Sequence, residues 1–511
     1  MSAWYLSPLR KTLKTLLSWI ETRQGESPRK DQASLLGREV HVPTPLVTAG
    51  SAAVLFFVLL PETGLSPHKI WALAGMLAFL VFFFVMYFRY DLPQFVNDDE
   101  AVFLTGLCLV LGVIFVELGL GIKGFPVYAL PIGAIAVVVT LLLHIRLALL
   151  ITFVLAIVAG VLNKFSFATM MVTFFAGTAA MLASKSVRQR GDIWRAGFHV
   201  AWVTAVAIYG LGLFNAWSFK TVWAQLRWAA PLNGFLCAVI PLGLLPVLES
   251  FFSRVTPITL LEVGDFNRPL LRRLMMEAPG TYHHTLLVAA MAEQAAEAIG
   301  ANSLLCRVGM YYHDIGKLVH PEYFIENQTM RRTPKDKPEM HDKLNPSMSS
   351  MVIMSHVKEG VALARANNVP EEILRFIPEH HGTSLIKYFY MRALEQNEEE
   401  APPAEIYRYS GPTPHSRETV IAMLADSSEA ASRSLEEPTY ERLLDLVEKI
   451  VNSKFMDGQF DNAPVTLADL RKIINSFAHS LSAIYHVRIE YPELPEQDAS
   501  RRLPPNQSQM L

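Results

Sequence analysis

Long apolar segments fill the first half of this 511-residue sequence and constrain its fold more than any other feature. Most of them approach the roughly 20 apolar residues that a helix needs to cross the hydrocarbon core of a bilayer. Eight can be distinguished, at residues 44–60, 70–88, 101–118, 125–144, 146–162, 166–183, 196–214 and 229–251. The first and fifth are short, and the fourth and fifth are nearly continuous, so the count could differ by one. A soluble bundle would not contain so many uniformly apolar runs, and we therefore expect a polytopic transmembrane bundle in a lipid bilayer.

The basic residues between these segments predict how the bundle is oriented. Eight spans place both chain ends on the same side of the membrane. If that side is the inner one, the inner segments before the second half hold thirteen basic residues: Arg10, Lys11, Lys14, Arg23, Arg29, Lys30, Arg38, Arg89, Arg146, Lys185, Arg188, Arg190 and Arg195. The outer connections hold five: Lys69, Lys123, Lys164, Lys220 and Arg227. Because basic residues favour cytoplasmic loops, we expect the N-terminus and the second half to be cytoplasmic.

The stretches at the two ends of the sequence differ from the rest. Residues 1–44 begin with an amphipathic pattern in which Leu9, Leu13 and Leu16 share one helical face. This pattern suits a helix on an anionic inner leaflet and equally an ordinary surface helix. The last residues are rich in Pro and Gln, and we expect them to be disordered. The predicted organisation is an N-terminal segment (1–44), a transmembrane bundle (45–252), a soluble helical domain (253–495) and a tail (496–511).

The second half has the composition of a soluble helical domain. Eleven of the 15 histidines lie from His283 onward, and about 250 residues suffice to bury a core. The formal net charge of −2 argues against binding to a nucleic-acid polymer through bulk charge. Cys108, Cys237 and Cys306 lie in apolar surroundings and are widely spaced, so we expect buried free thiols without disulfide or structural-zinc roles. The predicted fold class is all-α throughout.

Histidine and aspartate recur in the second half at positions embedded in helical patterns. Seven of them form the predicted site: His284, His313, Asp314, His356, His380, His381 and Asp426. Imidazole and carboxylate ligands suit divalent iron, manganese or zinc, and seven are too many for one ion. A lone histidine such as His284 is usually a core residue, but a carboxylate in the apolar helix around Asp426 is costly unless it is paired or coordinating. The set as a whole predicts a two-metal hydrolase site.

The adjacent pair His313-Asp314 is the centre of this prediction. Neighbours on a helix point about 100° apart, so the carboxylate can lean between two ions while the imidazole binds one. Lys317 follows one turn later, where it would neutralise a phosphate oxygen or, alternatively, cap the helix end. A second pair, His341-Asp342, lies in a Pro-flanked, Lys-rich stretch without a rigid scaffold, and we do not expect it to bind metal.

Seven short motifs resemble those of a known family. They are Tyr-His-His-Thr at 282–285, Tyr-Tyr-His-Asp-Ile-Gly-Lys at 311–317, Glu-Asn-Gln at 326–328, Ser-His-Val-Lys-Glu-Gly at 355–360, Glu-His-His-Gly-Thr at 379–383, Tyr-Ser-Gly-Pro at 409–412 and Met-Leu-Ala-Asp-Ser at 423–427. Over roughly residues 45–495 the chain resembles the membrane-bound seven-transmembrane HD-domain phosphohydrolases, which hydrolyse cyclic di-AMP in bacteria. The resemblance implies an all-helical HD fold with two metal ions, typically iron or manganese. It implies one ion on His284, His313, Asp314 and Asp426, and the other on Asp314, His356, His380 and His381, with Asp314 bridging.

The resemblance also implies an activity. We expect a phosphodiesterase of the bacterial inner membrane that converts cyclic di-AMP to 5′-pApA, using a hydroxide activated by two metals, with Asp314 and Lys317 as catalytic residues. An HD hydrolase of another nucleotide, such as cyclic di-GMP or an alarmone, and a nucleotide-binding receptor without hydrolysis remain alternatives. The family commonly has a large extracellular domain after its first helix. Only residues 61–69 occupy that place here, which puts the usual external sensing role in doubt. The sequence is compatible with a homodimer and does not test it.

Overall fold

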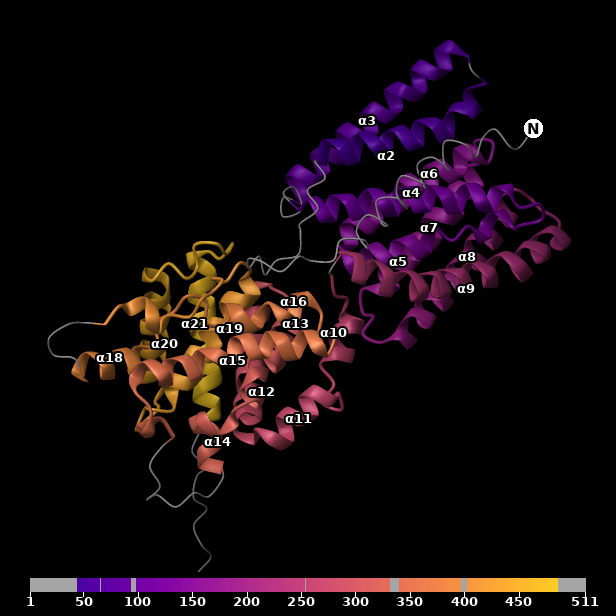
Figure 1. Ribbon diagram of the computed structural model, residues 1–511. Coiled ribbons are helices and arrows are strands. Elements are labelled where there is room, and N and C mark those ends of the chain that lie inside the picture. The colour runs from indigo at the N-terminus through magenta and orange to yellow at the C-terminus, as the bar shows by residue number, and fades with distance from the viewer. Residues whose placement is uncertain are drawn as a thin grey trace, which may run out of the picture.

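A computed structural model describes residues 44–64, 66–92, 98–252, 254–330, 340–396 and 402–485. Within these ranges every regular element is a helix, and the one β-bridge pairs Leu385 with Arg408. The helices form two bodies, a bundle of α2–α9 and a second body of α10–α21, which meet where α9 leads into α10 (Figure 1). This confirms the all-α fold class. The predictions for the amphipathic N-terminal stretch and the tail fall outside the described residues.

All eight predicted apolar segments are helical in the first body. Its helices are α2 (Thr44–Leu59), α3 (Pro67–Asp91), α4 (Asp99–Gly121), α5 (Ile132–Leu142), α6 (Ile145–Leu162), α7 (Phe167–Ser184), α8 (Arg190–Phe214) and α9 (Phe219–Phe252), with short 3-10 turns at Leu60–Thr63 and Val127–Ala129. Among the described residues, six helices (α3, α4 and α6–α9) are long and apolar enough to cross a membrane. The other two predicted spans correspond to the shorter apolar stretches Val47–Leu59 and Val127–Leu142.

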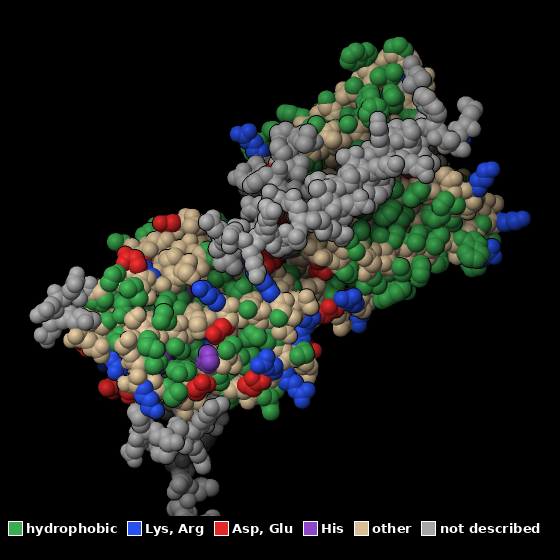
Figure 2. All heavy atoms as spheres, in the orientation of Figure 1, with side chains coloured by type: hydrophobic (Ala, Val, Ile, Leu, Met, Phe, Trp, Pro, Cys, Tyr) green, Lys and Arg blue, Asp and Glu red, His purple; other side chains and the backbone are tan. Residues whose placement is uncertain are grey.

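The short helix α5 lies at the centre of this bundle. It packs against α4, α6, α7 and α9, and every residue from Ile132 to Val139 is buried. The outer helices instead expose large apolar side chains, among them Trp71, Phe198 and Phe219, which are 78%, 72% and 83% exposed. Figure 2 shows this apolar surface over the first body, whereas charged side chains are spread over the second. Such an apolar surface suits lipid rather than water.

The two bodies are joined through α10 (Pro257–Val263) and polar contacts around it. Glu249, near the end of α9, accepts a hydrogen bond from the Thr259 hydroxyl at 2.9 Å. Arg190, the first residue of α8, pairs through Nε with Glu262 at 2.6 Å. These contacts place the start of the second body at the end of the bundle where α8 begins and α9 ends.

The second body is built around α12. Its elements are α11 (Pro269–Glu277), α12 (Pro279–Ile299), α13 (Ser303–Tyr312), η4 (Ile315–Leu318), η5 (Pro321–Tyr323), α14 (Ile325–Met330), η6 (Met340–Lys343), α15 (Pro346–Ala366), α16 (Glu371–Leu374), α17 (Phe376–Glu379), α18 (Lys387–Gln396), η7 (Ala404–Tyr407), α19 (Arg417–Ser432), α20 (Tyr440–Met456) and α21 (Leu467–Ile484). Buried alanines of α12, such as Ala289 and Ala292, let α13, α19 and α21 pack closely against it. The Asn302 side chain caps α13 by accepting a hydrogen bond from the Leu305 N–H. All three cysteines are free and buried, as expected.

Candidate metal centre

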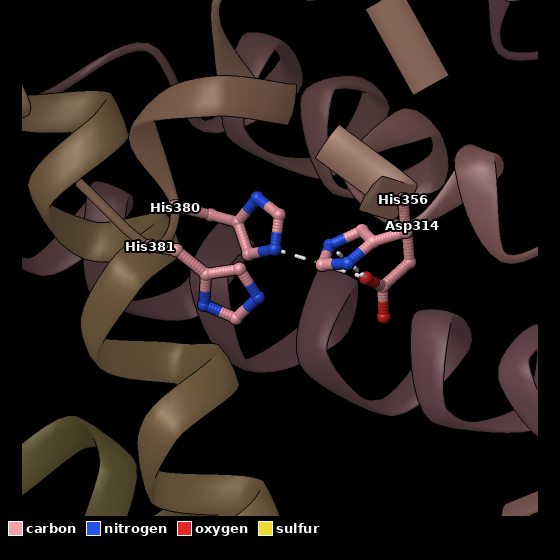
Figure 3. Close-up of side chains that lie close together, drawn as sticks. All are labelled: Asp314, His356, His380 and His381. Atoms are coloured by element: carbon pink, nitrogen blue, oxygen red, sulfur yellow. Dashed lines mark ion pairs between the residues drawn. The ribbon is translucent and has the colours of Figure 1, made fainter. Parts of the chain in front are cut away.

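The structure brings all seven predicted ligands together from five helices or helix ends. His284 lies on α12, His313 and Asp314 directly after α13, His356 on α15, His380 and His381 directly after α17, and Asp426 on α19. They form two groups, Asp314 with His356, His380 and His381, and Asp314 with His284, His313 and Asp426. In each group one ligand atom per residue lies within 4.8 Å of the others. The division is the one that the family resemblance implies, and Asp314 belongs to both groups. Figure 3 shows imidazoles of the first group near the Asp314 carboxylate.

The local structure at Asp314 differs from the expected one. Helix α13 ends at Tyr312, so His313 is its C-cap and Asp314 leads into the 3-10 turn η4. His313 still has helical backbone angles (φ −54°, ψ −37°), whereas Asp314 does not (φ −108°, ψ 15°). Asp314 is 1% exposed, and His313 is fully buried.

Backbone hydrogen bonds orient three of the imidazoles. The Nδ1 atoms of His313, His356 and His380 contact the carbonyl oxygens of the preceding turn at 2.6, 2.5 and 3.0 Å. A carbonyl can only accept, so each Nδ1 carries the proton and each Nε2 offers a lone pair. These Nε2 atoms lie 3.2, 3.5 and 3.7 Å from an Asp314 oxygen. They are buried and have no hydrogen-bond partner in the part of the chain that the structure describes.

This arrangement tests whether the residues fit a metal. Buried lone pairs of imidazoles that face a carboxylate repel one another and are costly when nothing lies between them. A divalent cation removes that cost, and imidazole with carboxylate is a ligand set that iron, manganese and zinc accept. The backbone carbonyls behind the rings are the outer partners that ligating histidines commonly have. The donor set therefore fits divalent metal ions.

His284 is oriented by a carboxylate that the sequence analysis did not single out. Its Nδ1 lies 2.7 Å from Glu429 Oε2, and its Nε2 lies 3.1 Å from Asp426 Oδ1. Glu429 follows Asp426 by one turn of α19, is 3% exposed and pairs with Arg433 at 2.7 Å. Burial lowers the pKa of His284, but hydrogen bonds to Asp426 and Glu429 outweigh it and raise the pKa to about 9. Glu429 is thus placed to hold this imidazole in its ligating orientation.

The three imidazoles of the other group, His356, His380 and His381, are held neutral, which is the form that binds metal. Burial lowers the pKa of His356, and burial together with His313 lowers the pKa of His380 to about 3. Burial and the neighbouring His380 hold the pKa of His381 well below its usual range. Proton loss from His356, His380 and His381 would therefore not oppose metal binding at neutral pH, whereas His284 would have to give up a proton.

Lys317 contacts carboxylates of the centre. Its Nζ lies 2.7 Å from Asp314 Oδ2 and 2.9 Å from Glu326 Oε1. Burial alone would raise the pKa of Asp314, but His313 and Lys317 outweigh it and hold the pKa well below the usual range. Lys317 thus keeps Asp314 ionised rather than capping a helix end through backbone carbonyls. Its predicted contact with a phosphate stays a prediction.

The second His-Asp pair lies apart from both groups. His341 Nε2 contacts the Tyr323 carbonyl oxygen at 2.9 Å, and Asp342 pairs with Arg392 at 3.4 Å. Among the described residues, neither of these two belongs to a ligand group.

A tight turn after His381 fixes this ligand. Gly382 has a φ of +55°, and a Cβ there would lie 2.3 Å from Gln459 Oε1. The fully buried Gln459 accepts a hydrogen bond from the Thr383 N–H at 3.0 Å and donates one to the Thr383 hydroxyl at 2.9 Å. Tyr409 stacks on the His381 ring with centroids 4.1 Å apart. Gly382, Thr383 and Tyr409 belong to two of the family motifs quoted above, whereas Gln459 lies outside all of them and was missed.

Replacing Glu429 with glutamine should weaken metal binding at the group that contains His284. Loss of an outer carboxylate of this kind typically costs about 10- to 100-fold in metal affinity. Titration of the metal-free protein with Mn²⁺ measures the change, and Glu448→Gln, at an exposed position of α20, is the matched control. Equal metal affinity in the two variants would show that Glu429 does not support the centre.

Two family models match this chain. Residues 68–256 match the family described as "7TM receptor with intracellular HD hydrolase", and residues 281–431 match the HD domain. The first match begins at the second residue of α3 and runs through α9, a region with seven α-helices. The second match contains all seven residues of the ligand groups. HD domains bind divalent metal ions, in agreement with the ligand set.

Two relatives with similar sequences carry the same name. The chain is 38% identical over 373 residues to the cyclic-di-AMP phosphodiesterase PgpH of Bacillus subtilis, an alignment of 72% of this chain and 51% of the relative. It is 35% identical over 398 residues to PgpH of Listeria monocytogenes, covering 77% and 54%. The chain thus spans about half the length of these curated relatives. A solved structure of the L. monocytogenes PgpH HD domain in complex with cyclic-di-AMP is 43% identical, covering 44% of this chain and 100% of that one, with a TM-score of 0.40.

The matches and the apolar helices agree on the type of protein. The matched transmembrane region contains the six helices that are long and apolar enough to span a bilayer, so the chain is a multi-pass membrane protein. The HD domain follows in the order that the family description gives. This chain therefore belongs to the family of membrane proteins in which a seven-transmembrane region precedes an intracellular HD hydrolase domain.

Proposed function

We propose that this chain hydrolyses cyclic di-AMP to the linear dinucleotide 5′-pApA at its HD-domain metal centre. The observation that carries the proposal is the pair of four-residue ligand groups that share Asp314. Relatives that are 35% and 38% identical and are named cyclic-di-AMP phosphodiesterases support the substrate. Iron and manganese are the proposed ions, because the family that the motifs resemble typically holds them and the imidazole and carboxylate ligands accept both.

The residues of the chain have distinct roles in this reaction. His284, His313, Asp314 and Asp426 would hold one ion, and Asp314, His356, His380 and His381 the other. Two divalent ions supply Lewis-acid activation of the attacking water and neutralise charge on the phosphodiester. Lys317 holds Asp314 ionised and adds a positive charge beside the position of the phosphate. The backbone carbonyls behind His313, His356 and His380 keep the rings facing the Asp314 carboxylate, so little reorganisation accompanies the reaction.

We propose further that the HD domain lies on the cytoplasmic side of a bacterial inner membrane. The excess of basic residues in the connections on one side of the bundle supports this orientation. Arg190 and Arg254 belong to that side. Arg190 of the bundle pairs with Glu262 of α10, and Arg254, which follows α9, pairs with Asp98. The nucleotide would then be drawn from the cytoplasm.

The proposal is tested by hydrolysis with the purified full chain in detergent. Metal-free protein is loaded with Mn²⁺ or Fe²⁺ and offered cyclic di-AMP and cyclic di-GMP side by side, with products separated by chromatography. The expected result is preferential conversion of cyclic di-AMP to 5′-pApA, lost in the double variant His313→Ala/Asp314→Ala. Preferential turnover of cyclic di-GMP would overturn the substrate. Tight binding of cyclic di-AMP without turnover with either metal would indicate a nucleotide receptor and not an enzyme.

A further inference from the structure

The end of α20 lies against the turn that carries His381. Lys454, in the last turn of α20, donates a hydrogen bond from Nζ to Ser384 Oγ at 2.7 Å. Ser384 closes the turn after His381 through its N–H, which donates to the His381 carbonyl oxygen at 3.1 Å. The same turn is fixed by Gln459, which binds Thr383 through both atoms of its amide. Lys454 therefore lies against the turn that follows the ligand His381, on an element that supplies no member of either ligand group.

This lysine has no counter-charge close to it. Within the described residues, no carboxylate oxygen lies within 4.0 Å of its Nζ, whereas Lys317 contacts both Asp314 and Glu326 inside 3 Å. The nearest acidic neighbours are already engaged, since Asp457 pairs with Arg408 at 2.9 Å and Asp426 binds His284. Of the three N–H donors of the ammonium group, Ser384 uses one. The other donors are available to an anion.

Electrostatics connect Lys454 with the centre. Its side chain is partly buried, and burial lowers its pKa while Asp426 and Asp457 act to raise it. Asp426 is a member of a ligand group, so its field reaches the ammonium group. An ammonium group that is withdrawn from water without a partner carries a desolvation cost, which a bound anion would relieve.

We propose that Lys454, held in place by Ser384, binds the phosphodiester of the substrate that is not being cleaved. This proposal rests on the function proposed above. A cyclic dinucleotide carries two phosphodiesters on opposite sides of one ring. When one of them lies at the metal centre beside Lys317, the other must lie outside both ligand groups, and Lys454 offers a positive charge there. The ligand class is thus a dinucleotide with two phosphates, and Lys454 selects it over a nucleotide with one.

A structural role for Lys454 makes a different prediction. Its place in the last turn of α20 would let it stabilise the helix through the partial negative charge at that end. Removing such an interaction would lower stability and affect all substrates alike. A phosphate-binding role affects only substrates that carry the second phosphate, and it does so through KM.

The test compares two substrates with the full chain loaded with Mn²⁺. Cyclic di-AMP has two phosphodiesters, and bis(p-nitrophenyl) phosphate has one. A charge-assisted hydrogen bond is lost in Lys454→Met, so we expect KM for cyclic di-AMP to rise about 10- to 100-fold with kcat nearly unchanged. Turnover of bis(p-nitrophenyl) phosphate should not change, and Lys454→Arg should restore part of the loss. Lys449→Met, on the same helix but in an exposed pair with Asp445, is the matched control and should behave as the unaltered chain.

Two results would overturn the role of Lys454. One is an equal loss with both substrates, and the other is an unchanged KM for cyclic di-AMP. The proposed function fails separately, if the unaltered chain cleaves bis(p-nitrophenyl) phosphate but not cyclic di-AMP. In that case the role of Lys454 is tested by measuring how strongly cyclic di-AMP inhibits the hydrolysis of bis(p-nitrophenyl) phosphate. Equal inhibition of Lys454→Met and of the unaltered chain would overturn that role.

Discussion

Replacing Asp314 with asparagine is expected to abolish most of the hydrolysis of cyclic di-AMP. Asp314 is the one residue common to both ligand groups, and the Nε2 atoms of His284, His313, His356 and His380 lie 3.2–3.7 Å from its oxygens. The substitution keeps the shape of the side chain but removes the negative charge that pairs with Lys317 and would bind the two divalent ions. Breaking a buried charge pair by removing one partner costs about 3–5 kcal/mol, which corresponds to roughly a 1000-fold loss. Steady-state kinetics and the metal content of the purified variant measure the effect.

The second His-Asp pair provides the control for this experiment. Asp342→Asn makes the same chemical change at a half-exposed position whose partner is Arg392. We expect this variant to keep both its metal and its rate. If Asp314→Asn retained as much metal and activity as Asp342→Asn, the two-group centre would not be the site of the reaction.

The transmembrane helices and the ligand set were predictable from the sequence for a simple reason. Each apolar segment is continuous along the chain, so hydropathy alone locates it, and the family motifs contain the ligands themselves. The number of helices long enough to span a membrane was harder to predict from the sequence, because α5 is short and is enclosed by neighbouring helices. Hydropathy does not distinguish a helix buried in protein from one that faces acyl chains.

The residues that support the centre were missed because their contacts are distant in the sequence. Glu429 binds His284 across 145 residues, Gln459 binds Thr383 across 76, and Lys454 binds Ser384 across 70. None of these pairs produces a local pattern. Glu429 did carry one weak signal, since a second carboxylate one turn after Asp426 on a helix with many buried residues calls for a partner. The helix end at Tyr312 was also missed, and the 3-10 turn η4 that follows it makes a close backbone contact with α15.

That backbone contact lies at Gly316, in η4. A Cβ on Gly316 would lie 1.8 Å from the carbonyl oxygen of His356 and 2.5 Å from the amide nitrogen of Gly360, both on α15. These are backbone atoms, so no side chain can rotate away to make room. Relief requires η4 and α15 to move apart, and that movement would separate His356 from Asp314, whose facing atoms are now 3.5 Å apart.

Gly316→Ala is therefore expected to damage both stability and metal binding. Forcing a methyl group into a closed contact costs about 1–3 kcal/mol and sometimes more, and here the neighbours are rigid helix backbone, so we expect the upper end. The melting temperature of the HD domain should fall, and the group that contains His356 should lose affinity for Mn²⁺ while the group that contains His284 loses less. Gly191→Ala is the control, because a Cβ at this position in α8 meets nothing within 4 Å. A variant as stable as Gly191→Ala, with both ions bound as tightly, would mean that the approach of η4 to α15 does not set the position of His356. Metal lost equally from both groups would mean instead that the strain reaches the centre through Asp314, which both groups share.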